Sequence, residues 1–350
     1  MSTGSRIPAV VGAVVVVGAL AAGACASGGN HAAPGGPTTT TTTATAPPTS
    51  VASGPTTTAR STVATASQAP AEQQRYEPSL PIAIQEAAAA TVGDRLYVVG
   101  GYDSSRNSSS AVFVLQGSSW TRGPSLPIAV NHPGAATIGN DVYVAGGFTP
   151  NGATNRAFVL TSGSNSWREL PSMRRARGAL ALLSRNGRLY AIGGRDRSLE
   201  IAQPEAYDPG TQAWNDLPSM PAPRNHVAGY VDGNVMCVAG GRTPDTSAAI
   251  DCFDPAGGDW VNRATLSTGT SGAAAVVMNG VTVVAGGEPA GETSIVGVIQ
   301  KLRQGSWTTT PMIVPRHGTA FAVYRGRLWM CGGATAPGFQ AVATCTSIVP

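Results

Sequence analysis

Acid and base side chains recur at one position of a repeat in this chain. Glu86, His132 and His226 hold the same place relative to the Gly-Gly doublets that follow them, and His317 lies one position earlier in its own repeat. Carboxyl and imidazole groups can transfer protons near neutral pH, and they can also hold a divalent metal ion. The chemistry open to this chain depends on whether its fold brings these side chains together.

Arginines occupy two more positions of the same repeat. Arg177, Arg224 and Arg316 share a place two positions before that of Glu86, each in its own repeat. Further charged residues follow the doublets closely: Arg195, Arg197, Arg242 and Glu288. A guanidinium can hold the carboxylate of a ligand through paired hydrogen bonds.

The doublets themselves define the elements that must position these side chains. They lie at a nearly constant spacing, at Gly100-Gly101, Gly146-Gly147, Gly193-Gly194, Gly240-Gly241, Gly286-Gly287 and Gly332-Gly333. A Trp follows each of the first five at an almost fixed distance along the chain: Trp120, Trp167, Trp214, Trp260 and Trp307. Each doublet ends an aromatic or β-branched run, which is typical of a strand bounded by glycine. A period of about 46 residues predicts a β-propeller with one four-stranded blade per repeat.

Segments of small apolar residues, such as AAAATV at residues 87–92, precede these runs. They are apolar on both alternating faces, so they predict strands buried on both sides, as the innermost strand of a blade is. Loops that enter the first strand and loops that leave the second then build one mouth of the propeller. The charged residues above fall in those loops.

The pattern resembles the kelch repeat over residues 72–350. Its markers are Tyr97, Tyr143 and Tyr190 before the doublets, the turn at residues 207–209, and the five Trp residues. Cys237 and Val283 replace the Tyr in blades 4 and 5. The resemblance implies an all-β, six-bladed kelch-type propeller. It also implies that an Arg at the place of Arg224 often bonds the backbone of the neighbouring blade, and that the position of His226 faces a ligand pocket. For the three arginines, both a structural role and a ligand contact stay open.

The two ends of the repeat region predict how the ring closes. Blade 6 lacks a Trp-bearing outer strand before Pro350, whereas residues 78–83 repeat the PSLPIA of residues 124–129. The segment of residues 73–81 should therefore complete blade 6, with Gln74 in the place of the Trp. Pairing the two termini in one sheet removes an open edge.

Composition limits the possible partners and source. Charged residues make up 12% of the chain, and the net charge of +4 is spread along it, which disfavours nucleic acid as a partner. One Lys stands against 22 Arg in a chain rich in Ala and Gly, which indicates a GC-rich bacterial genome, such as that of a Gram-positive species.

The N-terminal part is expected to lie outside the propeller. Residues 1–25 have the length and flanks of an export signal, ending in Ala22-Gly23-Ala24-Cys25. This end resembles a bacterial lipobox, in which Cys25 is lipidated, although Ala22 stands where Leu is usual. Ordinary signal cleavage and an uncleaved anchor are the alternatives. Residues 26–71 are almost entirely Ala, Ser, Thr, Pro and Gly, which predicts a disordered linker.

The other cysteines fit an exported protein. Cys237 and Cys252 fall on neighbouring strands of blade 4, and Cys331 and Cys345 fall on the same two strands of blade 6. We expect these two pairings, with free core thiols as the alternative. Together with Cys25, they predict a protein at the outer face of the cytoplasmic membrane or in the cell envelope, or else a secreted one.

Metal and cofactor chemistry is not expected. His132 and His226 lie two blades apart, and sheets pack about 10 Å apart, so their imidazoles should be too distant to share an ion. We predict no metal and no cofactor. Galactose oxidase, a copper enzyme on a kelch propeller, needs a Tyr–Cys crosslink, whereas packing explains the Tyr and pairing explains the Cys here.

The function expected is non-catalytic binding by a monomer. Its ligand would be a carbohydrate or a protein or peptide, bound at the mouth by Glu86, His132, Arg177, Arg195, Arg224, His226, Arg242, Arg316 and His317. The alternative is an enzyme resembling the sialic-acid mutarotases, which are exported six-bladed kelch proteins. Opening a sugar ring needs only an acid and a base near the anomeric oxygen.

Overall fold

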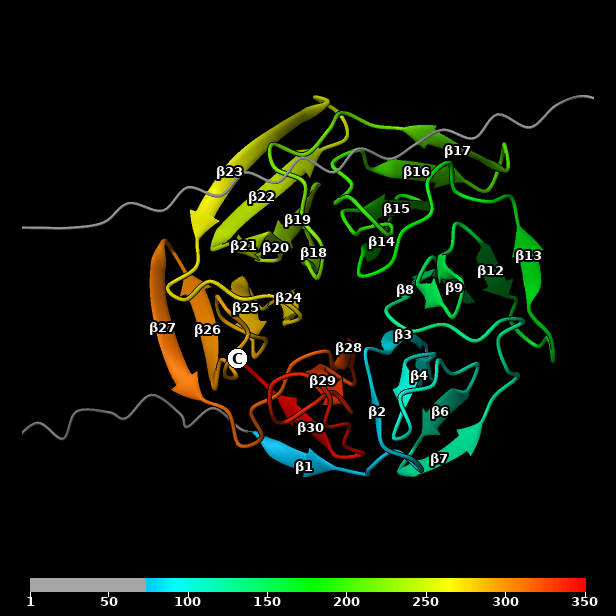
Figure 1. Cartoon of the computed structure of the whole chain (residues 1–350), viewed down its shortest axis with the longest axis horizontal. Coiled ribbons are helices and arrows are strands. Elements are labelled where there is room, and N and C mark those ends of the chain that lie inside the picture. The colour runs from blue at the N-terminus through cyan, green and yellow to red at the C-terminus, as the bar shows by residue number, and fades with distance from the viewer. Residues whose placement is uncertain (1–73) are drawn as a thin grey trace, which may run out of the picture. The chain divides into compact units, whose positions relative to one another are not determined.

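The computed structural model describes residues 74–350, which fold into strands, turns and loops. Six antiparallel four-stranded sheets stand around a central axis, as Figure 1 shows. The predicted all-β, six-bladed propeller is confirmed. The described residues fall within one compact unit. The predicted export signal, Cys25 and linker lie outside the described residues. Among the described residues, no helix has the length and apolarity that a membrane crossing needs.

The strands of each blade follow one another outward from the axis in chain order, except that the outer strand of blade 6 is β1. Blade 1 consists of β3 (Ala88–Val92), β4 (Arg95–Val99), β6 (Val112–Gln116) and β7 (Ser119–Arg122). Blade 2 consists of β8 (Gly134–Ile138), β9 (Asp141–Ala145), β12 (Ala157–Leu160) and β13 (Arg168–Leu170). Blade 3 consists of β14 (Ala181–Arg185), β15 (Arg188–Ile192), β16 (Glu205–Asp208) and β17 (Ala213–Asp216). Blade 4 consists of β18 (Ala228–Asp232), β19 (Val235–Ala239), β22 (Ala249–Asp254) and β23 (Asp259–Thr265). Blade 5 consists of β24 (Ala274–Met278), β25 (Val281–Ala285), β26 (Val298–Arg303) and β27 (Ser306–Pro311). Blade 6 consists of β28 (Ala320–Tyr324), β29 (Arg327–Cys331), β30 (Cys345–Ile348) and β1 (Arg75–Glu77). The first strand of each blade contacts the first strands of both neighbouring blades.

Three short two-stranded sheets extend the loops on one face. Two are hairpins, β10 (Phe148–Thr149) with β11 (Gly152–Ala153) and β20 (Arg242–Thr243) with β21 (Asp245–Thr246). The third pairs β2 (Ile84–Gln85) with β5 (Tyr102–Asp103), on either side of β3 and β4. Strands β5, β10, β11, β20 and β21 follow the second strands of their blades, and β2 precedes the first strand of blade 1. All six therefore belong to the loops that build the predicted mouth.

The glycine doublets join each blade to the next. In all six, both glycines have φ between 63° and 103°. A Cβ on the first glycine would lie 2.1–2.8 Å from a backbone carbonyl oxygen of the next blade. The N–H of the second glycine donates to that same oxygen over 2.8–2.9 Å. Glycine is required here by the left-handed backbone and also by the close approach.

The tryptophans make a second set of contacts between blades. The indole N–H of Trp120 donates to the carbonyl of Pro78 over 2.8 Å, and Trp167 donates in the same way to Pro124. Trp214 and Trp260 repeat the contact with Pro171 and Pro218. Each donor lies in or directly beside the outer strand of one blade, and each acceptor follows the outer strand of the blade before it.

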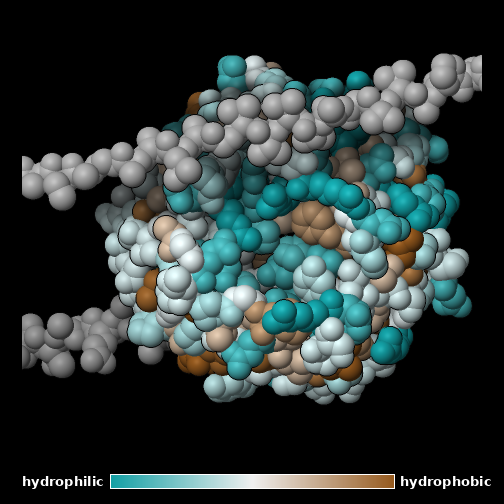
Figure 2. Space-filling view, viewed as in Figure 1, coloured by the Kyte–Doolittle hydropathy of each residue, from teal (hydrophilic) through white to brown (hydrophobic). Residues whose placement is uncertain are grey.

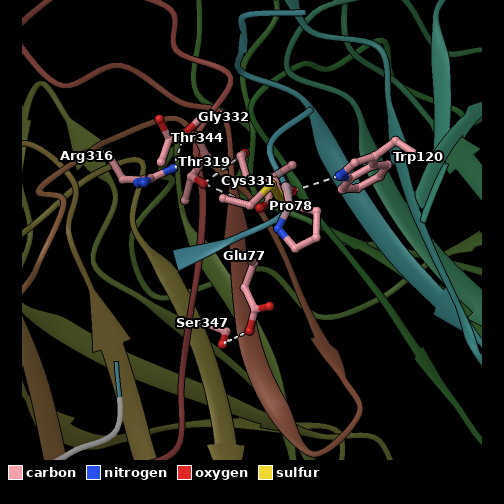
Figure 3. The surroundings of a disulfide bond; sticks show 11 residues. Glu77, Pro78, Trp120, Arg316, Thr319, Cys331, Gly332, Thr344 and Ser347 are labelled. Carbon is pink, nitrogen blue, oxygen red and sulfur yellow. Dashed lines mark hydrogen bonds between the residues drawn. A yellow bond between two sulfur atoms is a disulfide. The ribbon is translucent and has the colours of Figure 1, made fainter. Parts of the chain in front are cut away.

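Blade 6 is completed from both ends of the described chain. β1 pairs with β30, with Tyr76 opposite Thr346. The Ser347 hydroxyl donates to the Glu77 carboxylate beside this pairing (Figure 3). The predicted closure of the ring by an N-terminal strand is therefore confirmed.

Both predicted disulfides are present. Cys237 bonds Cys252 between β19 and β22, and Cys331 bonds Cys345 between β29 and β30. In each pair the two cysteines lie directly opposite one another in the strand register. Figure 3 shows the second disulfide close to the backbone where Pro78 accepts from Trp120.

Candidate functional site

A closed ring of backbone hydrogen bonds surrounds the axis at one mouth. One residue from each blade donates its N–H to the carbonyl of the matching residue in the preceding blade, over 2.7–3.0 Å. The members of this inner ring are Glu86, His132, Ala179, His226, Gly272 and Gly318. All six hold the repeat position at which the sequence places Glu86, His132 and His226.

The inner ring needs a left-handed backbone. All its members have φ between 50° and 66°, and four of them are not glycine. This conformation costs an L-amino acid about 1–2 kcal/mol relative to the right-handed region. Blades 5 and 6 use glycine here without that cost. Strained residues of this kind gather at functional sites, so Glu86, His132 and His226 are the leading candidates for a functional role.

The ring brings these three side chains together. Nε2 of His132 lies 3.2 Å from Oε2 of Glu86, and the ring centroids of His132 and His226 lie 4.9 Å apart. The expectation that the two imidazoles are too far apart to share an ion is therefore wrong. The spacing of about 10 Å applies to packed sheet faces, whereas blades narrow toward the axis until one hydrogen bond spans the gap between neighbours.

Two Asn-His dipeptides hold the imidazoles in place. Oδ1 of Asn131 accepts from Nδ1 of His132 over 2.5 Å, and Asn225 bonds His226 in the same way. The amide nitrogen of Asn131 donates to Ser108 Oγ and to the Phe148 carbonyl, which fixes the orientation of the amide. Each imidazole therefore carries its proton on Nδ1 when neutral, and Nε2 is left as an acceptor.

Charged residues of blades 4 to 6 surround the three. Nδ1 of His317 lies 3.6 Å from Oε1 of Glu86 and 3.5 Å from Oε2 of Glu288. Arg242 approaches Nε2 of His226 at 3.4 Å and pairs with Glu288 at 3.7 Å. It also forms an ion pair with Glu292. Acids and bases are thus nearly balanced in this part of the mouth.

These neighbours shift the protonation of the cluster. Burial would raise the pKa of Glu86, but the nearby His132 charge and the hydrogen bond from His317 outweigh it and hold that pKa well below its usual range. Burial lowers the pKa of His132. Burial also lowers the pKa of His226, and the positive charges of His132 and Arg242 lower it further. Burial opposes protonation of His317 too, yet its contact with Glu86 raises its pKa.

Three predicted site residues do not reach the mouth. The side chains of Arg177, Arg224 and Arg316 are at most 1% exposed and bond the carbonyl of the first doublet glycine in their own blades. Arg177 also pairs with Glu205, and Arg224 with Asp251. The prediction that these arginines line the mouth is corrected, because each guanidinium turns into its own blade to satisfy buried backbone oxygens.

Arg195 and Arg197 lie farther out on the mouth. The Arg195 side chain is 39% exposed, 4.0 Å from Glu200, and Arg197 is exposed and donates to the Asn151 carbonyl. Together with Arg242, they form what we call the arginine rim. Arg195 and Arg242 occupy the residue position directly after a doublet.

Two aromatic residues of the mouth escaped the sequence analysis. Tyr102 and Phe148 pack edge-on against the His132 ring, with centroids 5.8 and 5.5 Å away. Both occupy the same position after a doublet as Arg195 and Arg242. Comparing that position across all blades, rather than searching for charge alone, could have found them.

An apolar channel of about 280 Å³ adjoins the inner ring. Glu86, His132 and His226 line it, together with small and aliphatic residues of the first strands such as Ala88, Leu182 and Gly229. Figure 2 shows the face in view hollowed at its centre, with hydrophilic side chains gathered around the hollow. Polar groups thus stand against an apolar channel in the propeller's centre.

Comparisons with known proteins agree with this fold. The kelch motif is matched at residues 85–127, 130–174 and 176–221, which are blades 1 to 3. Alpha-scruin of Limulus polyphemus is 29% identical over 196 residues, covering 52% of this chain. Beta-scruin of the same animal is 31% identical over 134 residues, covering 36% of this chain. The chain spans only 21% and 15% of the lengths of these two proteins.

A solved structure shares the architecture. The structure of YjhT superposes with a TM-score of 0.69 at 18% identity, covering 78% of this chain and 97% of that one. At this identity the likeness concerns the fold alone. The chain is thus a six-bladed β-propeller with kelch motifs, a fold that commonly serves as a binding or scaffold module.

Proposed function

We propose that this protein is a non-catalytic binding module that takes a carbohydrate or protein ligand at the mouth of the propeller. One observation supports this most: Glu86, His132 and His226 occupy strained left-handed positions in the inner ring, where two other blades have glycine. Strained positions of this kind cluster at binding and active sites, which supports a ligand-binding role for these three side chains. On the side of blades 3 and 4, the arginine rim adds the cationic groups of Arg195 and Arg197, which reach solvent.

Proton transfer is less well supported than binding. A general base works best when its pKa lies near the working pH. The contacts of Glu86 with His132 and His317 hold its pKa well below the usual range, and the pKa of His317 is raised. The Glu86–His317 pair is therefore stabilised as ions, which makes a weak base beside a weak acid. A mutarotase-like activity would have to overcome this.

We further propose that the protein works outside the cytoplasm as a monomer, attached to the membrane through a lipid on Cys25. Its two disulfides support an oxidising compartment. The export signal and the linker, predicted from sequence, would place the propeller beyond the outer face of the membrane. Metabolic labelling with a fatty-acid probe, compared between the wild type and Cys25→Ala, tests the anchor.

The binding proposal is tested with the full chain on a glycan array and in pulldowns from cell-wall extracts. The variant Arg195→Ala/Arg197→Ala removes exposed charge from the arginine rim, and Arg185→Ala removes charge at the opposite end of β14 as a control. We expect the rim variant to lose at least about tenfold in affinity for any ligand recovered, because charged hydrogen bonds are worth about 1.5–3 kcal/mol each. Equal losses in both variants would contradict binding at the mouth.

The enzymatic alternative has a test of its own. Exchange between the anomers of sialic acid is followed by NMR with and without the protein. A rate above the spontaneous one, lost in Glu86→Gln, would favour the enzyme over the binding module.

A further inference from the structure

We propose that Glu86, His132 and His226 form a binding site for a divalent transition-metal ion, and that Zn²⁺ suits their donors. This inference stands independently of the ligand proposed above. It follows from the placement of three side chains around the axis, from the orientation of two imidazoles, and from a close contact between two acceptors.

The donor atoms are already gathered. The ligating atoms of Glu86, His132 and His226 all lie within 4.8 Å of one another. In a tetrahedral site with bonds of about 2.0–2.2 Å, the donors are about 3.4 Å apart. Nε2 of His132 and Oε2 of Glu86 meet this spacing at 3.2 Å. The ring of His226 lies against that of His132, and its ligating atom is within 4.8 Å of the other two.

The donors belong to a set that zinc is known to use. Two histidines and one glutamate, with a further position left open, hold Zn²⁺ in hydrolytic enzymes, and two histidines with a carboxylate also hold Fe²⁺. The side chains of Glu86 and His132 are 11% and 13% exposed. Such a site would be shielded by the blades but open toward the mouth, where water or a ligand could complete the coordination.

The orientation of the imidazoles is the orientation that metal ligands have. A ligating histidine usually donates its second ring N–H to a carbonyl or carboxylate oxygen, which fixes the ring. Asn131 and Asn225 supply those oxygens for His132 and His226. Asn225 is itself held because its amide nitrogen donates to Glu200 over 3.0 Å. Both Nε2 atoms are therefore left as acceptors, and that of His226 is approached by Arg242 in the metal-free protein.

A close contact in the cluster requires a positive charge. With its proton on Nδ1, His132 turns the lone pair of Nε2 toward a carboxylate oxygen of Glu86 only 3.2 Å away. Two acceptors at this distance repel each other unless a proton or a metal ion lies between them. A metal ion would satisfy both atoms and also Nε2 of His226.

The small members of the inner ring make room for the Glu86 carboxylate and leave space beside Gly272. A Cβ on Gly318 would lie 2.1 Å from Oε1 of Glu86, so the carboxylate lies across this glycine. A Cβ on Gly272 would meet its nearest atom at 3.5 Å. The guanidinium of Arg242 lies 3.4 Å from Nε2 of His226 and must move away from this atom when the ion binds. Its ion pairs with Glu288 and Glu292 can hold it in the withdrawn position.

The test is Zn²⁺ binding by the full chain without a histidine tag. The protein is stripped with EDTA, titrated with Zn²⁺ in a calorimeter, and analysed for bound metal by mass spectrometry. Co²⁺ then reports coordination number through the intensity of its visible absorption bands. We expect one ion per chain and the intense bands of a site with four or five donors.

Variants of the inner ring decide the location of the ion. His132→Gly, His226→Gly and Glu86→Gly introduce the residue that blades 5 and 6 already have, so the fold should tolerate them. Each should weaken Zn²⁺ at least about 100-fold, since even outer-shell changes cost about 10–100-fold. Ala179→Gly makes the same backbone change without removing a donor and should leave the affinity unchanged.

Two results would overturn the proposal. One is no uptake of Zn²⁺ at millimolar concentration, which would leave a proton as the charge between His132 and Glu86. The other is uptake that is equal in the wild type and in the three variants, which would place the ion elsewhere in the chain. Circular dichroism of each variant confirms that it is folded.

Discussion

The side-chain amide of Gln74 donates to the carbonyl oxygen of Pro311 over 2.7 Å, although 237 residues separate the two. In blades 1 to 4 the matching bond is made by a Trp indole and a proline carbonyl. Gln74 thus replaces an indole donor at the closure of the ring, as its place in the repeat predicts. It also accepts from the Ile313 N–H over 3.0 Å.

Removing this amide should loosen the closure. We expect Gln74→Ala to lower the free energy of unfolding by about 1–3 kcal/mol, since two hydrogen bonds at roughly 0.5–1.5 kcal/mol each are lost. Gln74→Trp should restore the donor and add packing. Urea unfolding followed by tryptophan fluorescence measures both. A Gln74→Ala protein as stable as the wild type would show that β1 alone closes blade 6.

The buried arginines should differ in their importance for stability. Arg224→Met leaves Asp251 buried without its partner, which should cost about 3–5 kcal/mol. Arg316 instead bonds the carbonyls of Gly332 and Thr344, and burial lowers its pKa to about 10. Arg316→Met should therefore cost less, about 1–3 kcal/mol. Urea unfolding ranks the two, and the reverse order would contradict the assigned partners.

Each disulfide should stabilise the fold through a short loop. The two pairs span 15 and 14 residues, which corresponds to about 3 kcal/mol each. We expect Cys331→Ala/Cys345→Ala and Cys237→Ala/Cys252→Ala to lose similar stability in chemical unfolding. Mass spectrometry with and without reductant checks the pairing. Additivity of the two losses in the quadruple variant would show that blades 4 and 6 contribute independently.

Two glycines of the inner ring provide a matched pair. Gly318→Ala and Gly272→Ala impose a similar left-handed cost, because φ is 57° and 66°. Only the first places a methyl group against the Glu86 carboxylate. We expect Gly318→Ala to weaken Zn²⁺ at least about tenfold while Gly272→Ala does not, as displaced ligands lose affinity. Equal effects in calorimetry would indicate that the carboxylate does not contribute.

In metal-free protein, the pKa values of His226 and His317 should be shifted in opposite directions from that of a free histidine. The pKa of His226 is well below and that of His317 above the ordinary value of 6.5. His226 therefore adds stability above pH 6.5 that is lost as the pH falls, because its protonated form favours the unfolded chain. His317 adds stability below pH 6.5 that is lost as the pH rises through its folded pKa. NMR titration, with single His→Gln variants for assignment, measures each ring, and two ordinary pKa values would contradict the geometry.

The sequence was informative where a position repeats. The doublets and tryptophans predicted the number of blades, the closing strand and both disulfides, because each depends on the register of strands within one sheet. Gln74 could be placed at a Trp position for the same reason. Local periodicity is sufficient for contacts of this kind.

The sequence pattern was misleading for side chains from different blades that meet near the axis. Treating blades as flat sheets about 10 Å apart separated His132 from His226, whereas the wedge shape of the blades brings their rings into contact. The direction of a side chain was also hidden: Arg224 turns inward to Asp251, while Arg242 faces the mouth. Only the backbone conformation of each loop decides between these directions, and composition does not encode it.

The disulfide of blade 6 also preserves the surface onto which the closing strand docks. Any pull on the N-terminal part of the chain reaches the propeller first at β1, which has three residues and pairs only along β30. If β1 were peeled away, Cys345 would still tie β30 covalently to Cys331 in β29. The other three strands of blade 6 would therefore stay joined, and they could capture β1 again once the load is released.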